Sequence, residues 1–252
     1  MKIINGIIGL LLLIGIAPNL FAQSEVNLCT INEKQMTCYT LNSGTLWKEL
    51  IKEIESMEEF ESNADLQFEW VRCHYGLAGV YMSEYDTENG SKVVAEGIKM
   101  NSKLLKQDEN NADYHSMMSG LYGLQIGFAP MKGMTLGSKS DRHVRKALKI
   151  DETNGFAWLQ QGSSYFHTPS FFGGDMEEAV KSYEQAVILT RDENDFDTNW
   201  MWLEAMTWLG QAYAKNDQLD EAEETYLAAL EVFPDFGWIK NSLLPSLQKK
   251  MK

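Results

Sequence analysis

The feature that most constrains this fold is an ordered set of small, aromatic and proline residues within 203–234. In chain order the set is Gly210, Tyr213, Ala222, Tyr226, Ala229 and Pro234. Gly210 and Ala222, twelve residues apart, are small enough to let two antiparallel helices approach closely, and the tyrosines fill the space beside that contact. Pro234 ends the second helix because proline cannot continue one. The spacing therefore predicts a helical hairpin that stacks on others of its kind.

A second unit, at about 154–190, repeats the spacing with five extra residues between its two helices. Its members are Trp158, Gly162, Tyr165, Ala179, Tyr183 and Ala186. A weaker third unit has Gly120 and Ala147 with an insertion at 127–140, and a fourth, around 66–105, shares only the helical pattern. Because stacked hairpins bury a continuous core only as an array, we expect a solenoid closed by a capping helix at about 236–248.

The remaining sequence has the same helical periodicity. From residue 45 onward apolar residues recur three and four positions apart, as Leu46, Leu50 and Ile54 do. The chain has five prolines, none of which interrupts these stretches, and no convincing alternating strand pattern is present. We therefore predict an all-α fold over 45–252, an α-solenoid of antiparallel helix pairs with a C-terminal capping helix.

Residues 1–22 are typical of a cleavable signal peptide. Lys2 precedes the apolar run at 7–16, and Ala22 provides the small residue expected before the cleavage site. The run is about half the length that spans a bilayer, which favours a signal peptide over the alternative of a retained anchor. We predict cleavage after Ala22, a loop segment at 23–44, and a periplasmic or secreted mature chain without a membrane span.

Export to an oxidising compartment would allow the cysteines to pair. Cys29 and Cys38 lie nine residues apart in the 23–44 segment and form a candidate disulfide, with two free thiols as the alternative. Cys73 lies in a strongly helical stretch, where we expect it to act as a small buried hydrophobe.

The charge balance excludes some partners. Lys and Arg total 22 against 36 for Asp and Glu, which gives a net charge of −14, and no basic run exceeds two residues. Such a chain repels phosphate backbones and anionic lipid, so we expect no nucleic-acid partner. The residue spacings that mark zinc sites, nucleophile elbows and phosphate-binding loops are absent, so we expect no cofactor, no bound metal and no enzymatic activity.

Two segments carry a family resemblance. The unit at 203–234 is similar to the tetratricopeptide-repeat (TPR) consensus, and the insertion Thr168-Pro169…Phe172-Gly173-Gly174-Asp175 and the ending Pro234-Asp235-Phe236-Gly237-Trp238 are distinctive. Together they resemble a group of exported TPR proteins of Gram-negative bacteria, largely without an assigned activity. The resemblance covers roughly 154–247 and implies a TPR-type α-solenoid that binds a partner, with no catalytic residues.

In TPR solenoids the first helix of each pair lines the concave face, so positions flanking the glycine of that helix are expected to contact a partner. These positions are Tyr114, Met117, Leu121, Leu124, Phe156, Leu159, Ser163, Phe166, Glu204, Thr207 and Gln211. The set is mostly apolar and lacks the Lys and Arg donors that capture a terminal carboxylate. It suits a hydrophobic peptide, an amphipathic helix or a small apolar ligand. The alternative is that several of these residues pack between neighbouring helices.

The insertions at 127–140 and 168–174 both fall in turns between the two helices of a pair. They carry the apolar residues Phe128, Met131, Met134, Phe171 and Phe172. We expect these loops to pack against the solenoid, with a lid over its groove as the alternative.

The sequence thus predicts an exported, non-enzymatic TPR scaffold that binds a protein or peptide in its concave groove. The alternative is a periplasmic solute-binding accessory of a transport system, similar to the TPR proteins associated with TRAP transporters. An enclosed apolar cavity would favour that alternative, and an open groove would favour the scaffold.

Overall fold

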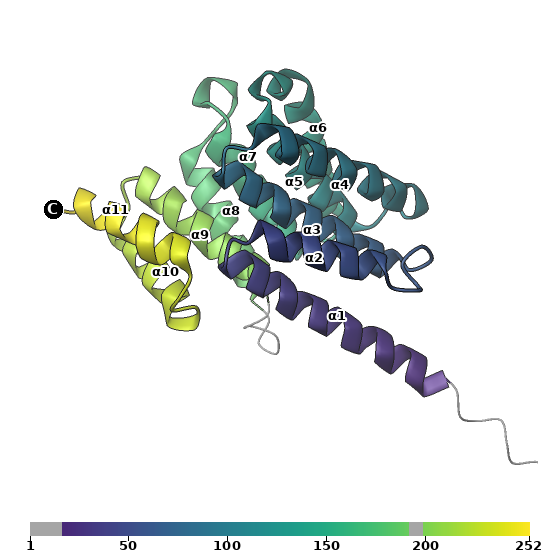
Figure 1. Ribbon diagram of the computed structural model, residues 1–252. Helices are drawn as coiled ribbons and strands as arrows, with labels where there is room; N and C mark the ends of the chain where they lie inside the picture. Colours follow the sequence, from purple (N-terminus) through teal and green to yellow (C-terminus); the bar gives the residue numbers. More distant parts are fainter. Residues whose placement is uncertain (1–16, 192–198) are drawn as a thin grey trace, which may run out of the picture.

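The computed structural model describes residues 17–191 and 199–252, and all the regular structure in this part of the chain is helical (Figure 1). The core of the predicted signal peptide lies outside the described residues. The α-helices are α1 (Ala17–Thr40), α2 (Gly44–Glu55), α3 (Ala64–Ser83), α4 (Thr87–Gln107), α5 (Ala112–Phe128), α6 (Gly133–Ile150), α7 (Gly155–His167), α8 (Met176–Thr190), α9 (Trp200–Lys215), α10 (Leu219–Val232) and α11 (Leu244–Lys250). The short helical turns are η1 (Pro130–Lys132), η2 (Ser170–Phe172) and η3 (Ile239–Leu243). The predicted all-α fold is confirmed.

Most helices begin at a residue whose side chain caps the first turn. Asn63, Asn111, Asn154, Asp175 and Asn199 each accept a hydrogen bond from a backbone N–H two or three residues further on. Such a cap satisfies a donor that the helix cannot satisfy itself. The caps fix where α3, α5, α7, α8 and α9 start and therefore how each helix meets its neighbour.

The small residues of the repeats lie where helices cross. A Cβ placed on Gly162 would lie 2.6 Å from Cδ1 of Tyr183, and one on Gly210 would lie 2.3 Å from Cε1 of Tyr226. Both tyrosine rings are buried in the contact between the two helices of a pair, α7 with α8 and α9 with α10. The glycines therefore set the distance between these helices, as the spacing predicts.

The expected loop at 23–44 is helical instead, because α1 extends to Thr40. Its inward side carries Leu28, Ile31, Gln35 and Cys38, spaced by three and four residues, and the last three of these are buried. The stripe was missed because Gln35 interrupts its apolar character. In the fold Gln35 donates from Nε2 to Oε2 of Glu69 at 2.8 Å and so replaces its lost water contacts.

The candidate disulfide between Cys29 and Cys38 is also wrong. Both cysteines are free; Cys29 is exposed and Cys38 is buried. Nine residues along one helix separate two Cα atoms by about 13 Å, well beyond the roughly 7 Å limit of a disulfide. Cys73 is fully buried, as expected of a small hydrophobe.

The two ends of the array meet. The first helix α1 contacts α3 and also α9, so it bridges the second and the fifth helical hairpins (Figure 1). Trp200 at the start of α9 is 1 % exposed and donates from Nε1 to Oε1 of Gln35 at 3.0 Å. Its ring lies 5.6 Å from that of Trp47 in α2 and 5.2 Å from that of Tyr39. The core therefore runs across the inner side of the array.

Candidate functional site

The inner side of the array is lined by α3, α5, α7 and α9, the first helices of four pairs. Seven of the eleven predicted contact residues lie in its interior: Tyr114, Met117, Leu121, Phe156, Leu159, Glu204 and Thr207. The other four, Leu124, Ser163, Phe166 and Gln211, are half-buried. The seven buried side chains are not accessible to a partner in this conformation, so the expectation of one groove along the whole inner side is wrong.

Side chains of the N-terminal helices fill the space. Tyr75 of α3 reaches α7 and α9: its ring lies 5.5 Å from that of Phe156 and 6.2 Å from that of Trp200. Phe68, also in α3, lies 5.1 Å from Tyr114. The predicted groove requires an open superhelix, whereas side chains of α1 and α3 fill the inner side.

Glu204 is the ionisable group at the centre of this closure. It is 7 % exposed, and its Oε1 accepts a hydrogen bond from the hydroxyl of Tyr75 at 2.9 Å, while its Oε2 has no hydrogen-bond partner. Burial raises the pKa of Glu204 from 4.5 to about 7, an effect that interactions with Tyr75 and Trp208 partly offset. The hydroxyl of Tyr39 is also buried without a partner. The carboxyl thus lies inside the protein as part of the packing between α3 and α9.

The C-terminal end of the array, where α7, α9 and the segment before α11 meet, carries exposed aromatic side chains. Here lies an aromatic cluster, which we define as Phe166, His167, Trp208 and Trp238. The Trp208 ring lies 5.7 Å from Phe166, 5.2 Å from His167 and 6.0 Å from Trp238, each edge to face. Trp238 is 40 % exposed and His167 is exposed, so a partner can reach the cluster.

Lys215 adds a positive charge to this cluster. Its ammonium lies 4.2 Å from the centroid of the Phe166 ring and donates to the Phe166 carbonyl at 3.1 Å. The rings of Phe166 and Trp208 partly desolvate the His167 imidazole, and together with the nearby Lys215 this lowers the pKa of His167 and keeps the imidazole neutral at pH 7. The surface is therefore aromatic with one cation at its border.

Sequence reasoning found part of this surface. Phe166 is among the predicted contact residues, whereas His167, Trp208, Lys215 and Trp238 are not. Trp208 lies one turn after Glu204 in the same helix, so the periodicity could have included it. Trp238 follows the last repeat, and only the packing of the C-terminal segment against α9 brings it to the cluster.

The two predicted insertions carry further exposed apolar side chains, and the first insertion is shorter than expected because 133–140 belongs to α6. Phe128 packs into the core at 8 % exposure, whereas four other apolar side chains of the insertions are largely exposed. These are Met131 (82 %), Met134 (86 %), Phe171 (89 %) and Phe172 (76 %). The expectation that the loops pack against the solenoid is therefore wrong for these four side chains.

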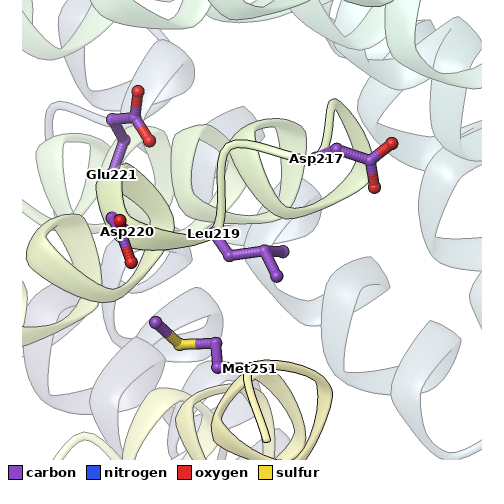
Figure 2. A pocket seen from close by; sticks show the side chains of 5 residues that line it. All are labelled: Asp217, Leu219, Asp220, Glu221 and Met251. Atoms are coloured by element: carbon purple, nitrogen blue, oxygen red, sulfur yellow. The ribbon is translucent and has the colours of Figure 1, made fainter.

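A pocket of about 330 Å³ lies between the α9–α10 turn and the C-terminus (Figure 2). The carboxylates of Asp217, Asp220 and Glu221 line it, with Leu219 above and Met251 below (Figure 2). It is open to solvent, and no unpartnered buried polar side chain points into it.

Within the described ranges, no three His, Cys, Asp or Glu side chains come close enough to hold a metal ion, and no helix is both long and apolar enough to cross a membrane.

The comparisons with known proteins agree with the helical-pair geometry. The tetratricopeptide-repeat family model matches residues 203–236, and no curated protein matches the sequence. The fold is similar to that of the HusA haemophore from Porphyromonas gingivalis, with a TM-score of 0.59, 20 % identity, and coverage of 76 % of this chain and 93 % of that one. TTC0263, a TPR protein of Thermus thermophilus, is similar with a TM-score of 0.48 and 18 % identity, over 82 % of this chain and 86 % of that one.

The repeat match falls on α9 and α10, and α7 and α8 repeat the same contact between a glycine and a buried tyrosine. The chain therefore contains a tetratricopeptide repeat at 203–236 within an all-α solenoid fold.

Proposed function

We propose that this protein is an exported scaffold that binds a protein or peptide partner at the aromatic cluster. The observation that carries the proposal is the exposure of Trp238 and His167 beside Trp208 and Phe166, on an inner side that is otherwise filled. Aromatic side chains supply large contact areas and are enriched where partner binding is strongest. The fold supports a scaffold role, since TPR solenoids present helix faces to partners.

The chemistry of the cluster favours an apolar segment of the partner. Edge-to-face rings leave ring faces and edges for an aromatic or branched aliphatic side chain, and Lys215 offers one contact to an acidic neighbour. A single ammonium falls short of the several donors of a terminal-carboxylate clamp. We therefore expect an internal hydrophobic motif rather than a free C-terminus to bind here.

Site-specific photo-crosslinking in cells that export the chain tests this function. A photoreactive residue at position 238 should capture a defined partner, and the same residue at position 172, in the exposed turn, should not. With the purified partner, Trp208→Ala should raise Kd at least tenfold, and Phe172→Ala less than twofold. In the same samples, mass spectrometry should find the mature chain beginning at Gln23. Equal affinity of Trp208→Ala and the unmodified chain, with an unchanged circular dichroism spectrum, rules the site out.

A second candidate is the capture of a small apolar solute, the class of the transport-accessory alternative. HusA is described as a haemophore, and here a neutral exposed imidazole, flat ring faces and an ammonium lie together, as binding of a planar ligand with carboxylates requires. The pockets at the surface are open to solvent rather than enclosed, which favours the protein partner. Haemin added to the cross-linking experiment distinguishes the protein partner from the apolar solute. Competition of haemin with the partner, and a Soret shift that is lost in His167→Ala, would favour the solute.

A further inference from the structure

Helix α6 is strongly basic in an acidic chain. Its 18 residues contain five of the 22 Lys and Arg residues, and Asp141 is its one acidic residue. The basic residues are Lys139, Arg142, Arg145, Lys146 and Lys149. A chain of net charge −14 that concentrates positive charge on one helix creates a local field of the opposite sign.

A pocket of about 240 Å³ lies against this helix. It is lined by Arg142, His143 and Lys146 of α6, by His115 of α5, and by Glu109 of the preceding loop. Pockets for drug-sized molecules begin at roughly 300 Å³, so this one suits a small solute or one end of a larger one. It lies on a different surface from the aromatic cluster and shares no residue with it.

The two histidines form a hydrogen-bonded pair in the lining of the pocket. The Nδ1 atoms of His115 and His143 are 2.7 Å apart, so one donates a hydrogen bond to the other. Nε2 of His115 lies 3.0 Å from the Glu109 carbonyl, to which it can donate. This arrangement holds both rings in place and leaves Nε2 of His143 without a hydrogen-bond partner among the described residues.

The cations that line the pocket are not neutralised by ion pairs. Arg145, on the same helix but outside the pocket, pairs with Asp141, whereas no carboxylate in the described part of the chain lies within ion-pair distance of Arg142 or Lys146. Lys146 donates only to the amide oxygen of Asn110, at 3.3 Å. Glu109 is the one acidic residue at the rim, and it is exposed to solvent.

We propose that this pocket binds a sulfate or phosphate group carried by a small solute. Arg142 supplies the planar donor fork that suits such oxyanions, Lys146 a second positive charge, and the histidine pair a group that can take up a proton. A cation is disfavoured by the same charges. A flat anionic membrane is disfavoured by the chain's net charge, so the solute is free rather than part of a lipid bilayer.

Proton uptake should accompany binding. Burial, the neighbouring histidine and Arg142 lower the pKa of His143 to about 4, and burial and Lys146 lower that of His115, while Glu109 opposes this. The pair is thus neutral at pH 7 in the free protein. A bound dianion favours the protonated form and raises these pKa values, so binding should tighten as pH falls.

The test is a titration of the full-length mature chain with sodium sulfate at constant ionic strength, followed by NMR of the imidazole signals of His115 and His143. Sulfate keeps its double charge between pH 5 and 8, so any pH dependence comes from the protein. We expect saturable shifts at both histidines, with Kd at least threefold lower at pH 5 than at pH 8. Inorganic phosphate at pH 7 should produce the same saturable shifts.

Single-residue variants distinguish a specific oxyanion site from a general electrostatic attraction of anions to α6. Arg142→Gln and Lys146→Gln should each raise the sulfate Kd at least fivefold, and Arg145→Gln, one turn away on the same helix, less than twofold. His143→Gln should weaken the pH dependence and retain binding, because His115 is then the one imidazole of the pair left to take up a proton. Equal effects of Arg142→Gln and Arg145→Gln, or shifts that do not saturate, would refute the site. Flotation with phosphatidylglycerol vesicles that Arg142→Gln abolishes would overturn the free solute in favour of a lipid headgroup.

Discussion

At the residue scale, Glu204 shows that the position of a residue in a repeat can be predicted from sequence while its environment cannot. The repeat spacing places it correctly on the inner face of α9, and from sequence alone that face is expected to meet solvent or a partner. The structure buries its carboxyl against Tyr75, which comes from 129 residues earlier in the chain. No local pattern encodes that contact, because it depends on how α3 packs across the array.

The stability of the protein should therefore depend on pH through Glu204. Its pKa is about 7 when folded and 4.5 when exposed. Between these values the folded state keeps a proton that the unfolded state has lost, so the contribution of Glu204 to the free energy of unfolding falls as pH rises from 4.5 to 7 and levels off above. We expect the free energy of unfolding of the wild type to fall by roughly 3 kcal/mol across this window, relative to that of Glu204→Gln.

Urea unfolding at intervals between pH 4.5 and 8, followed by circular dichroism, measures that difference. Glu224→Gln removes an exposed carboxylate from α10 and is the matched control, which should run parallel to wild type. Parallel curves for Glu204→Gln and wild type would contradict a buried, proton-binding Glu204.

At the element scale, the helix pairs were predictable and α1 was not. Glycine and tyrosine at fixed spacing describe a contact within one hairpin, which is local in sequence, so the two clearest repeats follow directly from it. Helix α1 owes its position to Trp200 and Glu69, and its buried Gln35 looks like a surface residue in the sequence. The prediction for the surface insertions was wrong for a related reason. Periodicity does not tell whether an apolar residue outside the repeat pattern packs against another part of the protein.

Two glycine substitutions should have opposite effects. Gly210→Ala places a methyl group 2.3 Å from the buried Tyr226 ring, and such overpacking costs about 1–3 kcal/mol, more than the roughly 1 kcal/mol that alanine adds to helix stability. Gly123→Ala, exposed in α5, meets no atom within 4 Å and should be stabilising by up to about 1 kcal/mol. Thermal unfolding should show a lower Tm for the first and a higher Tm for the second. A higher Tm for both would show that Gly210 does not set the helix spacing.

At the scale of the whole molecule, the contact between α1 and α9 joins distant parts of the chain. Gln35 and Trp200 are 165 residues apart and share a buried hydrogen bond. Of the site, the sequence predicted the aromatic Phe166 and the face to which it belongs. It could not predict which residues of that face stay exposed, because this depends on the closure by α1 and α3.

Gln35→Ala tests this closure. The change leaves the Trp200 indole N–H without its acceptor in the core and creates a cavity beside Glu69, so the free energy of unfolding should fall by about 2–4 kcal/mol. Glu33→Ala, exposed on the same helix, should change it by less than about 0.5 kcal/mol. Tryptophan fluorescence during urea unfolding measures both, and similar midpoints for the two variants would mean that α1 does not hold the array closed.

The bridge from α1 to α9 also bears on how the protein can evolve. An open solenoid tolerates the gain or loss of a repeat, since each repeat contacts only its neighbours. Here an added hairpin between α3 and α9 would move Trp200 away from Gln35 and Tyr75 away from Glu204. The number of repeats in this part of the chain is thereby fixed. We therefore expect changes in chain length to be tolerated in the turns rather than by gain or loss of a repeat.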